Sequence, residues 1–204
     1  MKEQQLYKNL AKYYELIYSE KDYKKEAEKI ISLINKNKKS KGKELLDVAC
    51  GTGKHLIYFK KKFNCTGVDI NEGMLKIARK RLPEIKFLKG DMKTFKTKKK
   101  FDVITCLFSS LGYMKTKQDL KRAINNLSKN LNPGGIIILE PWFDKKHYHP
   151  NTSHLSTFEE NDIKIVRMSY SKLKGNISTQ EMHYLIANKK GIEYHEILRI
   201  STHT

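Results

Sequence analysis

The stretch ELLDVACGTGKHL, residues 44–56, decides how the rest of the chain is interpreted. Its first half, ELLDVA, is a short apolar run of the kind that forms a buried strand. A loop of small residues follows, and we expect a helix from Gly53 to Phe63. Small residues let the backbone approach a ligand closely, and the start of a helix offers free N–H groups. The stretch therefore predicts a ligand-binding strand, loop and helix.

Strand and helix patterns alternate after this stretch. A helix capped by Asn71 is expected to run to about Arg81, and another from Lys117 to Asn130. The further strands expected are CTGVDI (65–70), EIKFLKG (84–90), FDVITCLF (101–108) and IIILE (136–140). Apolar strands separated by helices predict an α/β fold with a doubly wound, mostly parallel sheet covered on both faces.

The two ends of the chain show different patterns. The first 40 residues carry two apolar helix faces, one with Tyr7, Leu10, Ala11, Tyr14, Ile17 and Tyr18, the other with Tyr23, Ala27, Ile30, Ile31 and Ile34. From about His154, alternating residues and polar turns at 160–162, 175–176 and 188–191 predict an antiparallel meander. We expect this meander to be too short for a core of its own and to cover the active edge of the sheet.

The chain is therefore interpreted as one domain, 1–204. It would comprise an N-terminal helical cap (1–40), an α/β core that binds the cofactor (41–150) and an antiparallel meander over the substrate (151–204).

Composition restricts the class of protein. Hydrophobic residues make up 39% and charged residues 31%, which is typical of a globular domain. The chain has no apolar run long enough for a membrane span and no secretion signal, and its three cysteines lack metal-ligand spacing. We expect a cytoplasmic protein with reduced thiols and predict no metal site.

The net charge of +19 raises the question of nucleic-acid binding. The excess is mostly lysine, because the chain holds only five arginines, at 79, 81, 122, 167 and 199. Arginine is the residue suited to bidentate recognition of phosphates and bases. We interpret the lysines as a solvated surface and predict no specific nucleic-acid partner.

The loop after the first strand excludes several nucleotide sites. It does not fit the Walker pattern, Leu56 stands where the dinucleotide fingerprint needs a small residue, and GxSxG is absent. Asp47 at the mouth of the loop would repel a pyrophosphate. A carboxylate there suits a ligand with an ammonium and a sulfonium, and S-adenosylmethionine carries both.

Acidic residues also end the next two strands. Asp69 follows the loop by about 20 residues, where a carboxylate can accept hydrogen bonds from ribose hydroxyls. Asp91 is placed to accept the adenine amino group with Met92 against the ring, and Leu107 and Phe108 could close its other side. These residues are all predicted to bind the cofactor. The other positions in the loop and at the strand ends that are predicted to bind it are Asp47, Ala49, Gly51, Gly53 and Ile70.

Longer motifs add a resemblance to a known family. LLDVACGTGKHL, MLKIARKRLPEIKFLKGDM, FDVITCLFSSLGYM and LNPGGIIILEPWF together resemble class I, Rossmann-like methyltransferases. The chain is most similar to the N,N-dimethyltransferases of dTDP-linked amino sugars such as desosamine and mycaminose. The likeness includes LAKYYELIYSEKDY and TQEMHYLIA. It implies S-adenosylmethionine as cofactor, Tyr14 and Tyr23 in the cofactor pocket, and Tyr7 and Trp142 near the substrate.

The resemblance also carries departures from the family. Ala49 replaces the first glycine of the common loop, and the family continues beyond Thr204 through a further helix and a strand pair. The chain is thus expected to be either a fragment or a sheet without its usual antiparallel edge.

The acceptor pocket is predicted to open beyond 109–113, with Tyr113, and 140–143, which follow the fourth and fifth strands. His183 is the candidate proton acceptor, and its alternative is a strand histidine bonded to a neighbour. We expect N-methylation of a small molecule, with an amino sugar linked to a nucleotide as the favoured substrate. An RNA methyltransferase and a non-catalytic S-adenosylmethionine-binding protein stay open as alternatives, and so does a homodimer.

Overall fold

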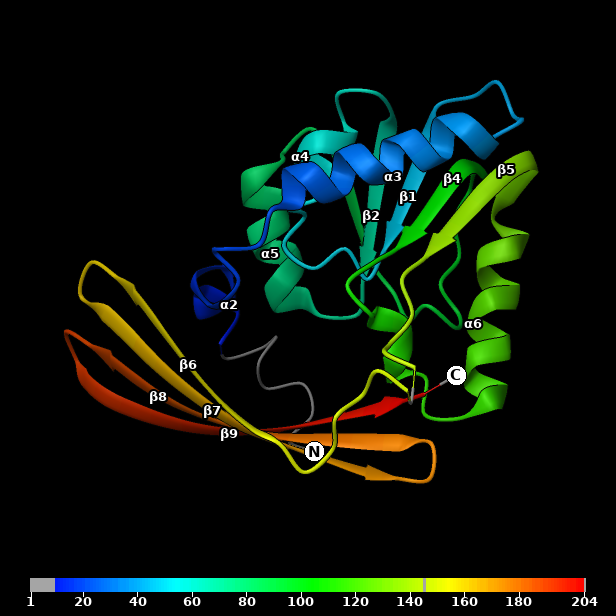
Figure 1. The fold of residues 1–204 in the computed structure, drawn as a ribbon. Helices are drawn as coiled ribbons and strands as arrows, with labels where there is room; N and C mark the ends of the chain where they lie inside the picture. Colours follow the sequence, from blue (N-terminus) through cyan, green and yellow to red (C-terminus); the bar gives the residue numbers. More distant parts are fainter. Residues whose placement is uncertain (1–9, 145, 204) are drawn as a thin grey trace. The chain divides into compact units, whose positions relative to one another are not determined.

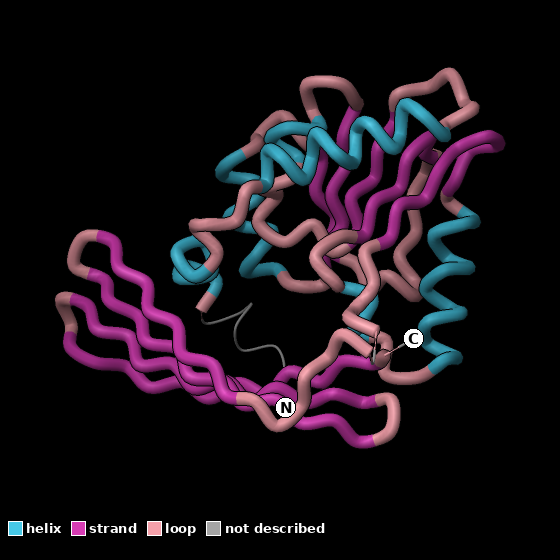
Figure 2. Tube along the Cα trace, viewed as in Figure 1, coloured by secondary structure: helices cyan, strands magenta, loops and turns pink. Residues whose placement is uncertain are grey.

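The computed structural model describes residues 10–144 and 146–203, so Tyr7 lies outside the described residues. The chain divides into two compact units. The parallel-sheet unit is Asp22–Pro141, and the antiparallel-sheet unit comprises the described residues up to Lys21 and from Trp142 onward. Helices and parallel strands make up the first unit, and long hairpins dominate the second (Figures 1 and 2). No helix within the described ranges is long and apolar enough to cross a membrane.

The first unit contains a five-stranded parallel sheet with the order β3-β2-β1-β4-β5. Its strands are β1 (Glu44–Val48), β2 (Asn64–Asp69), β3 (Lys86–Lys89), β4 (Phe101–Cys106) and β5 (Leu131–Leu139). The order reverses between β1 and β4, which lie side by side in the middle of the sheet. Ligands of doubly wound sheets bind beyond the carboxyl ends of strands at this kind of reversal. The predicted fold class is confirmed.

Helices cover both faces of this sheet. Helices α3 (Tyr23–Asn37), α4 (Leu56–Phe59) and α5 (Glu72–Arg81) share one apolar cluster with Leu45. Helix α6 (Lys117–Lys129) and the short 3₁₀ helix η1 (Ser110–Tyr113) pack on the other side with Leu46. Leu45 and Leu46 are both fully buried. Because each face of β1 packs on helices, residues 45–48 are all buried, with no alternation between buried and exposed positions.

The helix expected from Gly53 to Phe63 is shorter than predicted. Only Leu56–Phe59 form α4. Gly51 and Gly53 have left-handed φ angles of 55° and 77°, so the backbone before α4 follows the loop rather than a helix. The chain after α4 continues in single turns, with Phe63 N–H bonded to the Phe59 carbonyl. The glycines that shape the loop therefore delay the helix.

The second unit is built on a four-stranded antiparallel sheet in the order β6-β7-β8-β9. Its strands are β6 (Ser153–Glu160), β7 (Ile163–Lys174), β8 (Ile177–Asn188) and β9 (Gly191–Thr202). The three turns lie where the sequence predicts them, so the meander is confirmed. The meander shares a core with a helix from the start of the chain, which the sequence analysis did not predict. Helix α2 (Ala11–Ile17) packs on one face and completes an apolar cluster with Tyr184 at its centre.

Helix α2 buries a different tyrosine from the one predicted. The Tyr13 side chain is buried, whereas Tyr14 is half-buried and packs against Tyr18. Asn188 Nδ2 donates to the Tyr13 hydroxyl over 3.2 Å. A polar partner on the sheet thus lets the buried face of α2 hold a tyrosine.

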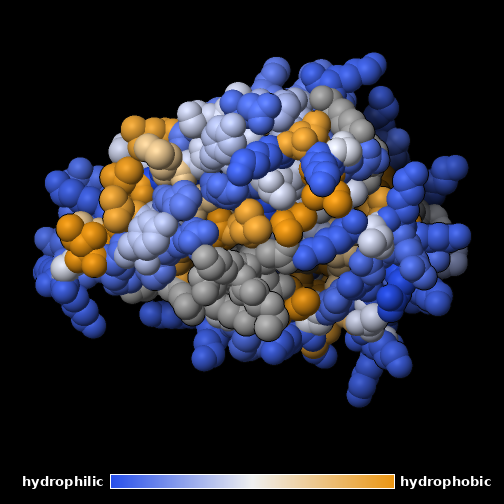
Figure 3. All heavy atoms as spheres, turned by 90° about the horizontal axis from the view of Figure 1, so that it is seen from below, coloured by the Kyte–Doolittle hydropathy of each residue, from blue (hydrophilic) through white to orange (hydrophobic). Residues whose placement is uncertain are grey.

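The opposite face of this sheet, the outer face, is apolar and exposed. Strand alternation and register place Val166, Met168, Leu185 and Tyr194 on it, with exposed fractions from 38% to 58%. Figure 3 shows hydrophobic residues, in orange, exposed among hydrophilic ones. Isolated exposed apolar residues are ordinary, but a contiguous set marks an interaction surface.

Replacing Asn71 should destabilise the parallel-sheet unit. Its side-chain oxygen accepts from Gly73 N–H at 2.9 Å and Met74 N–H at 3.3 Å, which caps α5. Asn71→Ala is expected to lower the free energy of unfolding by about 1 kcal/mol, whereas Asn71→Ser retains a capping oxygen and should lose far less. Urea unfolding of both variants measures the difference, and equal losses would contradict the capping role.

Candidate active site

The loop after β1 is held in a conformation that exposes backbone. Ala49 has a φ of 58°, which is uncommon for a residue with a side chain, and Gly51 and Gly53 are also left-handed. A Cβ added at Gly51 would meet no atom within 4 Å. The space beside Gly51 is therefore open, and a ligand can approach its backbone directly.

Asp69 ties this loop to the end of β2. One carboxylate oxygen accepts from Gly51 N–H at 2.8 Å, and the other accepts from Asn71 N–H at 2.7 Å. Each oxygen has a second lone pair for a further donor. Burial raises the pKa of Asp69, and the bonds from the Asn71 and Gly51 N–H groups oppose that rise. Ile70, beside it, is 48% exposed.

Asp47 is the most buried acid of the site, with 2% of its surface exposed. Thr105 from β4 donates its hydroxyl to Asp47 over 2.7 Å. Burial raises the pKa of Asp47 to about 6, and the Asp69 charge adds to the rise, whereas His55 and the Thr105 hydroxyl oppose it. Asp47 thus changes its charge just below neutral pH.

His55 joins the loop to α3. Its Nε2 lies 2.9 Å from a Glu26 carboxylate oxygen, and its ring contacts the Tyr23 ring edge-on at 5.0 Å. The predicted pocket residue Tyr23 therefore lies next to the residue whose charge influences Asp47. The sequence analysis missed His55 and Glu26, because a histidine just before a short helix and an acid in the preceding helix show no joint pattern.

Asp91 begins the turn after β3. Its carboxylate accepts from Lys93 N–H at 2.8 Å, and its side chain is half-buried, as is that of Met92. Asn126 of α6 donates to the carbonyls of Met92 and Phe95, each over 3.1 Å. The turn that carries Asp91 is thus fixed from the opposite helix layer, a role that the sequence pattern did not reveal.

The chain leaves β4 through two strained residues. Leu107 is buried, and Phe108 and Ser109 have φ angles of 53° and 56°. Glu140, at the end of β5, accepts from Phe108 N–H at 2.7 Å, and the Ser109 hydroxyl donates to the Pro141 carbonyl. Tyr113 follows in η1 with a half-buried side chain. Segments 109–113 and 140–141 thus meet directly within this unit, as expected from the strand ends.

The structure brings the predicted residues of the parallel-sheet unit to the carboxyl ends of its strands. Asp47 is the next-to-last residue of β1 and Ala49 follows that strand, Asp69 ends β2, Asp91 follows β3 and Phe108 follows β4. These positions fit S-adenosylmethionine, because bare backbone at Gly51 and buried acids face one sheet edge. Within the described residues, no group of three or more His, Cys, Asp or Glu is placed to hold a metal ion.

The remaining predicted residues belong to the antiparallel-sheet unit. Trp142 donates its indole N–H to the Ser178 hydroxyl over 3.1 Å and lies under the Arg199 guanidinium, 4.1 Å from the ring centre. Tyr14 packs within the same unit. The contact of Trp142 with substrate and of Tyr14 with cofactor stay predictions.

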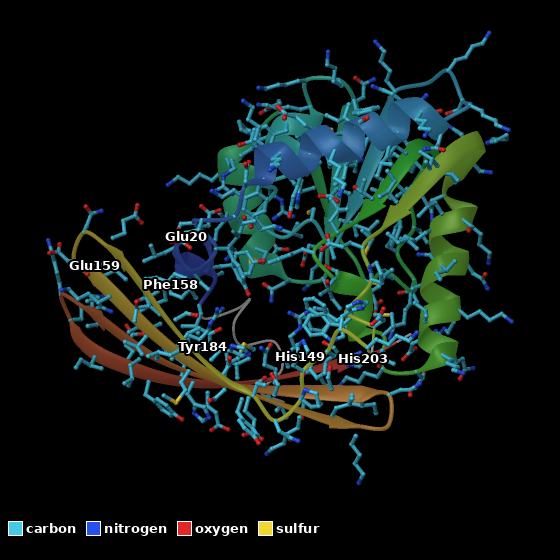
Figure 4. The ribbon with its side chains drawn as sticks, in the orientation of Figure 1. Glu20, His149, Phe158, Glu159, Tyr184 and His203 are labelled. Carbon is cyan, nitrogen blue, oxygen red and sulfur yellow. The ribbon has the colours of Figure 1, made fainter. Side chains whose placement is uncertain are left out.

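His183 lies on the outer face of the antiparallel sheet. Its Nδ1 is 2.7 Å from the Tyr194 hydroxyl, and the two rings stack at 6.0 Å. Its neighbour Tyr184 points into the cluster with α2, as does Phe158 (Figure 4). The bond to a neighbouring strand supports the alternative of a structural histidine, and the proton-acceptor role stays a prediction.

Comparison with known proteins places this geometry in a family. A methyltransferase-domain model matches residues 45–135. The dTDP-3-amino-3,4,6-trideoxy-α-D-glucopyranose N,N-dimethyltransferase of Streptomyces venezuelae is 35% identical over 93% of this chain and 81% of its own length. The dTDP-3-amino-3,6-dideoxy-α-D-glucopyranose N,N-dimethyltransferase of Streptomyces fradiae is 34% identical over 92% of this chain and 74% of its own length.

Solved structures agree. Streptomyces venezuelae DesVI superposes with a TM-score of 0.87 at 35% identity and covers 94% of this chain and 83% of DesVI. The amino pentose methyltransferase CalS10 of Micromonospora echinaspora, solved with bound S-adenosylmethionine, gives 0.80 at 30% identity, over 90% of this chain and 78% of CalS10. The chain is an S-adenosylmethionine-dependent methyltransferase and belongs to the family of class I enzymes that includes the dTDP-amino-sugar N,N-dimethyltransferases.

Proposed function

We propose that this protein methylates the amino group of a small molecule, and that a nucleotide-linked amino sugar is its acceptor. One observation carries the proposal. Two enzymes named for this reaction match more than nine-tenths of the chain, including the antiparallel-sheet unit that lies outside the methyltransferase domain model. A surface with a net charge of +19 also suits an acceptor that carries a diphosphate.

The strand-end residues are proposed to hold the cofactor. Asp47 would face its ammonium group, and Asp69 would accept from the ribose hydroxyls. Asp91 would accept from the adenine amino group, between Met92 and the residues Leu107 and Phe108. When bound, S-adenosylmethionine supplies an electrophilic methyl group on a sulfonium. The residues of the chain then have one main task, which is to hold the amine in line with it.

Alignment rather than base catalysis is proposed to carry the rate. Orientation of two reactants contributes roughly 7–11 kcal/mol to lowering a barrier. A neutral amine already has the lone pair that attacks, so a base needs only to take up the released proton. His183, bonded to Tyr194, is accordingly expected to contribute at most about 10²-fold, the low end for a general base.

A homodimer through the outer face of the antiparallel sheet is part of the proposal. Eight apolar residues exposed there, namely Leu155, Val166, Met168, Tyr170, Ile177, Leu185, Ile192 and Tyr194, offer on the order of 800 Å², about what one partner contributes to a standard interface. The charged residues on this face are Lys164, Lys172, Lys174, Glu159, Glu181 and Glu196, so the face is formally neutral on a strongly basic chain. A second copy can therefore pack on this face without the charge repulsion that two basic surfaces would cause.

A reducing cytoplasm is the proposed location. Cys50, Cys65 and Cys106 are free thiols, and burial raises the pKa of each of them, that of Cys65 to about 12. Free thiols that stay protonated suit a compartment in which disulfides do not form.

The acceptor class can be tested by steady-state kinetics. The holoprotein is expected to transfer methyl groups to dTDP-3-amino-3,6-dideoxyglucose and its 4-deoxy form, and to leave unmodified tRNA and rRNA unmethylated. His183→Ala should retain at least about one-hundredth of the wild-type rate. Methylation of RNA, with no turnover of either sugar, would favour the RNA methyltransferase instead. Tight cofactor binding without any turnover would favour the non-catalytic alternative.

Cofactor binding should depend on the charge of Asp47. Its pKa of about 6 means that the carboxyl is protonated at lower pH and cannot hold an ammonium group. The affinity for S-adenosylhomocysteine is expected to fall by about tenfold per pH unit below pH 6, because one proton must leave for each ligand bound. Titration calorimetry measures this, and 5′-methylthioadenosine, which lacks the amino-acid part, should bind independently of pH. Parallel pH profiles for the two ligands would contradict the assignment.

Stability provides an independent check on Asp47. Its pKa is raised on folding, so the folded protein binds the proton more tightly than the unfolded chain. The stability from this group is present near pH 4 and is lost as the pH rises to about 6. The loss is about 3 kcal/mol, and Asp47→Asn should remove that part of the pH dependence. Urea unfolding between pH 4.5 and 7 compares the two proteins.

The dimer is tested by light scattering coupled to size exclusion. Wild type should have twice the 23.9 kDa mass of one chain, and Leu185→Lys should shift it to a single chain at micromolar concentration. The control is Leu33→Lys on α3, where the leucine is 43% exposed against 51% for Leu185, and it should leave the mass unchanged. A monomeric wild type would disprove the arrangement.

A further inference from the structure

A cluster of aromatic rings lies in the antiparallel-sheet unit, between the start of segment 142–152 and the end of β9. Trp142 contacts Phe143 edge-on at 5.3 Å and Tyr148 at 6.4 Å. Tyr148 in turn meets His203 edge-on, with ring centroids 4.7 Å apart. Residues more than 50 positions apart in the chain thus form one aromatic wall.

Trp142 is fixed within this cluster from two sides. Its N–H is bonded to Ser178, and the Ser178 hydroxyl donates to the Ser201 carbonyl over 3.3 Å. The Arg199 guanidinium covers one face of its ring at 4.1 Å. A tryptophan held in this way is a rigid platform, so the rings that contact it are also ordered.

His203 has a buried ring nitrogen that lacks a hydrogen-bond partner. The side chain is only 2% exposed, and its Nδ1 lies 2.7 Å from the Phe143 carbonyl oxygen. A carbonyl oxygen can only accept, so Nδ1 carries the hydrogen. In the neutral ring Nε2 is then an acceptor. This buried Nε2 has no hydrogen-bond partner in the described part of the structure.

The Tyr148 hydroxyl is a second polar atom without a hydrogen-bond partner. It is buried and also has no partner among the described residues. Buried polar atoms are nearly always hydrogen-bonded, so two unpaired polar atoms on adjacent rings need an explanation. Other histidines are satisfied, since His55 pairs with Glu26, and His183 with Tyr194. A phenylalanine in place of Tyr148 would keep the ring and avoid the cost of burying an unpaired hydroxyl.

We propose that His203 Nε2 and the Tyr148 hydroxyl form a recognition pair for a ring hydroxyl of the acceptor sugar. His203 accepts the hydrogen of that hydroxyl, and Tyr148 donates to its oxygen. The wall formed by Trp142, Phe143 and Tyr148 supplies the apolar surface on which the C–H face of a sugar ring packs. Figure 4 labels His203 near the end of β9. The inference rests on the proposed function, because it assigns that acceptor a subsite.

This pair determines specificity rather than chemistry. A site built to bond a hydroxyl discriminates strongly against the analogue without it, since its own polar atoms then stay unpaired. The two relatives are named for sugars that differ by the hydroxyl at C4. The protein should therefore distinguish acceptors by one ring hydroxyl, and His203 should be responsible.

The kinetic test is a cycle of variants and acceptors. Wild type, His203→Phe and Tyr148→Phe are assayed with dTDP-3-amino-3,6-dideoxyglucose and with its 4-deoxy and 2-deoxy forms. Removal of the recognised hydroxyl should lower the wild-type kcat/KM by roughly 10-fold to 100-fold, mainly through KM. His203→Phe should lose this discrimination and keep its kcat/KM for the deoxy sugar. An equal loss for all acceptors would show a merely structural histidine and overturn the proposal.

The matched control is His154→Phe, an exposed strand histidine that should behave as wild type. Thermal unfolding verifies that each variant is folded. Tyr148→Phe keeps the ring and removes only the hydroxyl, so it provides the same comparison if His203→Phe does not fold.

A binding readout separates this inference from the proposed function. In ¹H–¹⁵N spectra of the imidazoles, recorded with S-adenosylhomocysteine bound, the His203 Nε2 resonance should move on addition of the hydroxylated sugar but not of the deoxy sugar. A shift without turnover supports the subsite while the proposed function fails. Turnover without a shift overturns the subsite alone. Neither shift nor turnover refutes both.

Discussion

The Asp69 carboxylate is the contact on which the rest of the site depends. It accepts from Gly51 on one side and Asn71 on the other, and so joins the loop after β1 to the start of α5. Without this carboxylate, the left-handed loop would lose the bond that fixes Gly51 N–H. Burial of Asp69 is costly, which its raised pKa expresses, and the two N–H bonds offset part of that cost.

The buried charge of Asp69 affects its neighbour Asp47. Two acids buried side by side repel each other, and Asp69 contributes to the raised pKa of Asp47. Thr105 and His55 oppose the rise, and His55 is itself paired with Glu26. A ligand with a positive group would relieve the same repulsion. The electrostatics therefore favour a cationic ligand even before any relative is considered.

Regular features of the sequence predicted the sheet and the positions of its acids, because strand ends follow directly from apolar runs. The turns of the meander could also be predicted from the sequence, since Gly175 and Asn176 are turn formers. Contacts between side chains far apart in the sequence could not be predicted. His55 finds Glu26 from 29 positions away, and Asn126 reaches the Asp91 turn from α6. No spacing rule connects such residues, and the core shared by α2 and the meander was missed because its two parts lie at opposite ends of the chain.

Backbone strain marks the same place as the acids. Among described residues other than glycine, left-handed φ angles occur at Ala49, Phe108 and Ser109, and in the surface turns at Asn151 and Asn161. The first three follow β1 and β4, the two central strands where the sheet order reverses. Glu140 holds Phe108 in place, as Asp69 holds Gly51. A strained residue persists only where its surroundings fix it, so a carboxylate at each exit keeps the backbone shaped for a ligand. Acids at these strand ends thus serve the loops first, and any bond to a cofactor uses the lone pairs that the loops leave open.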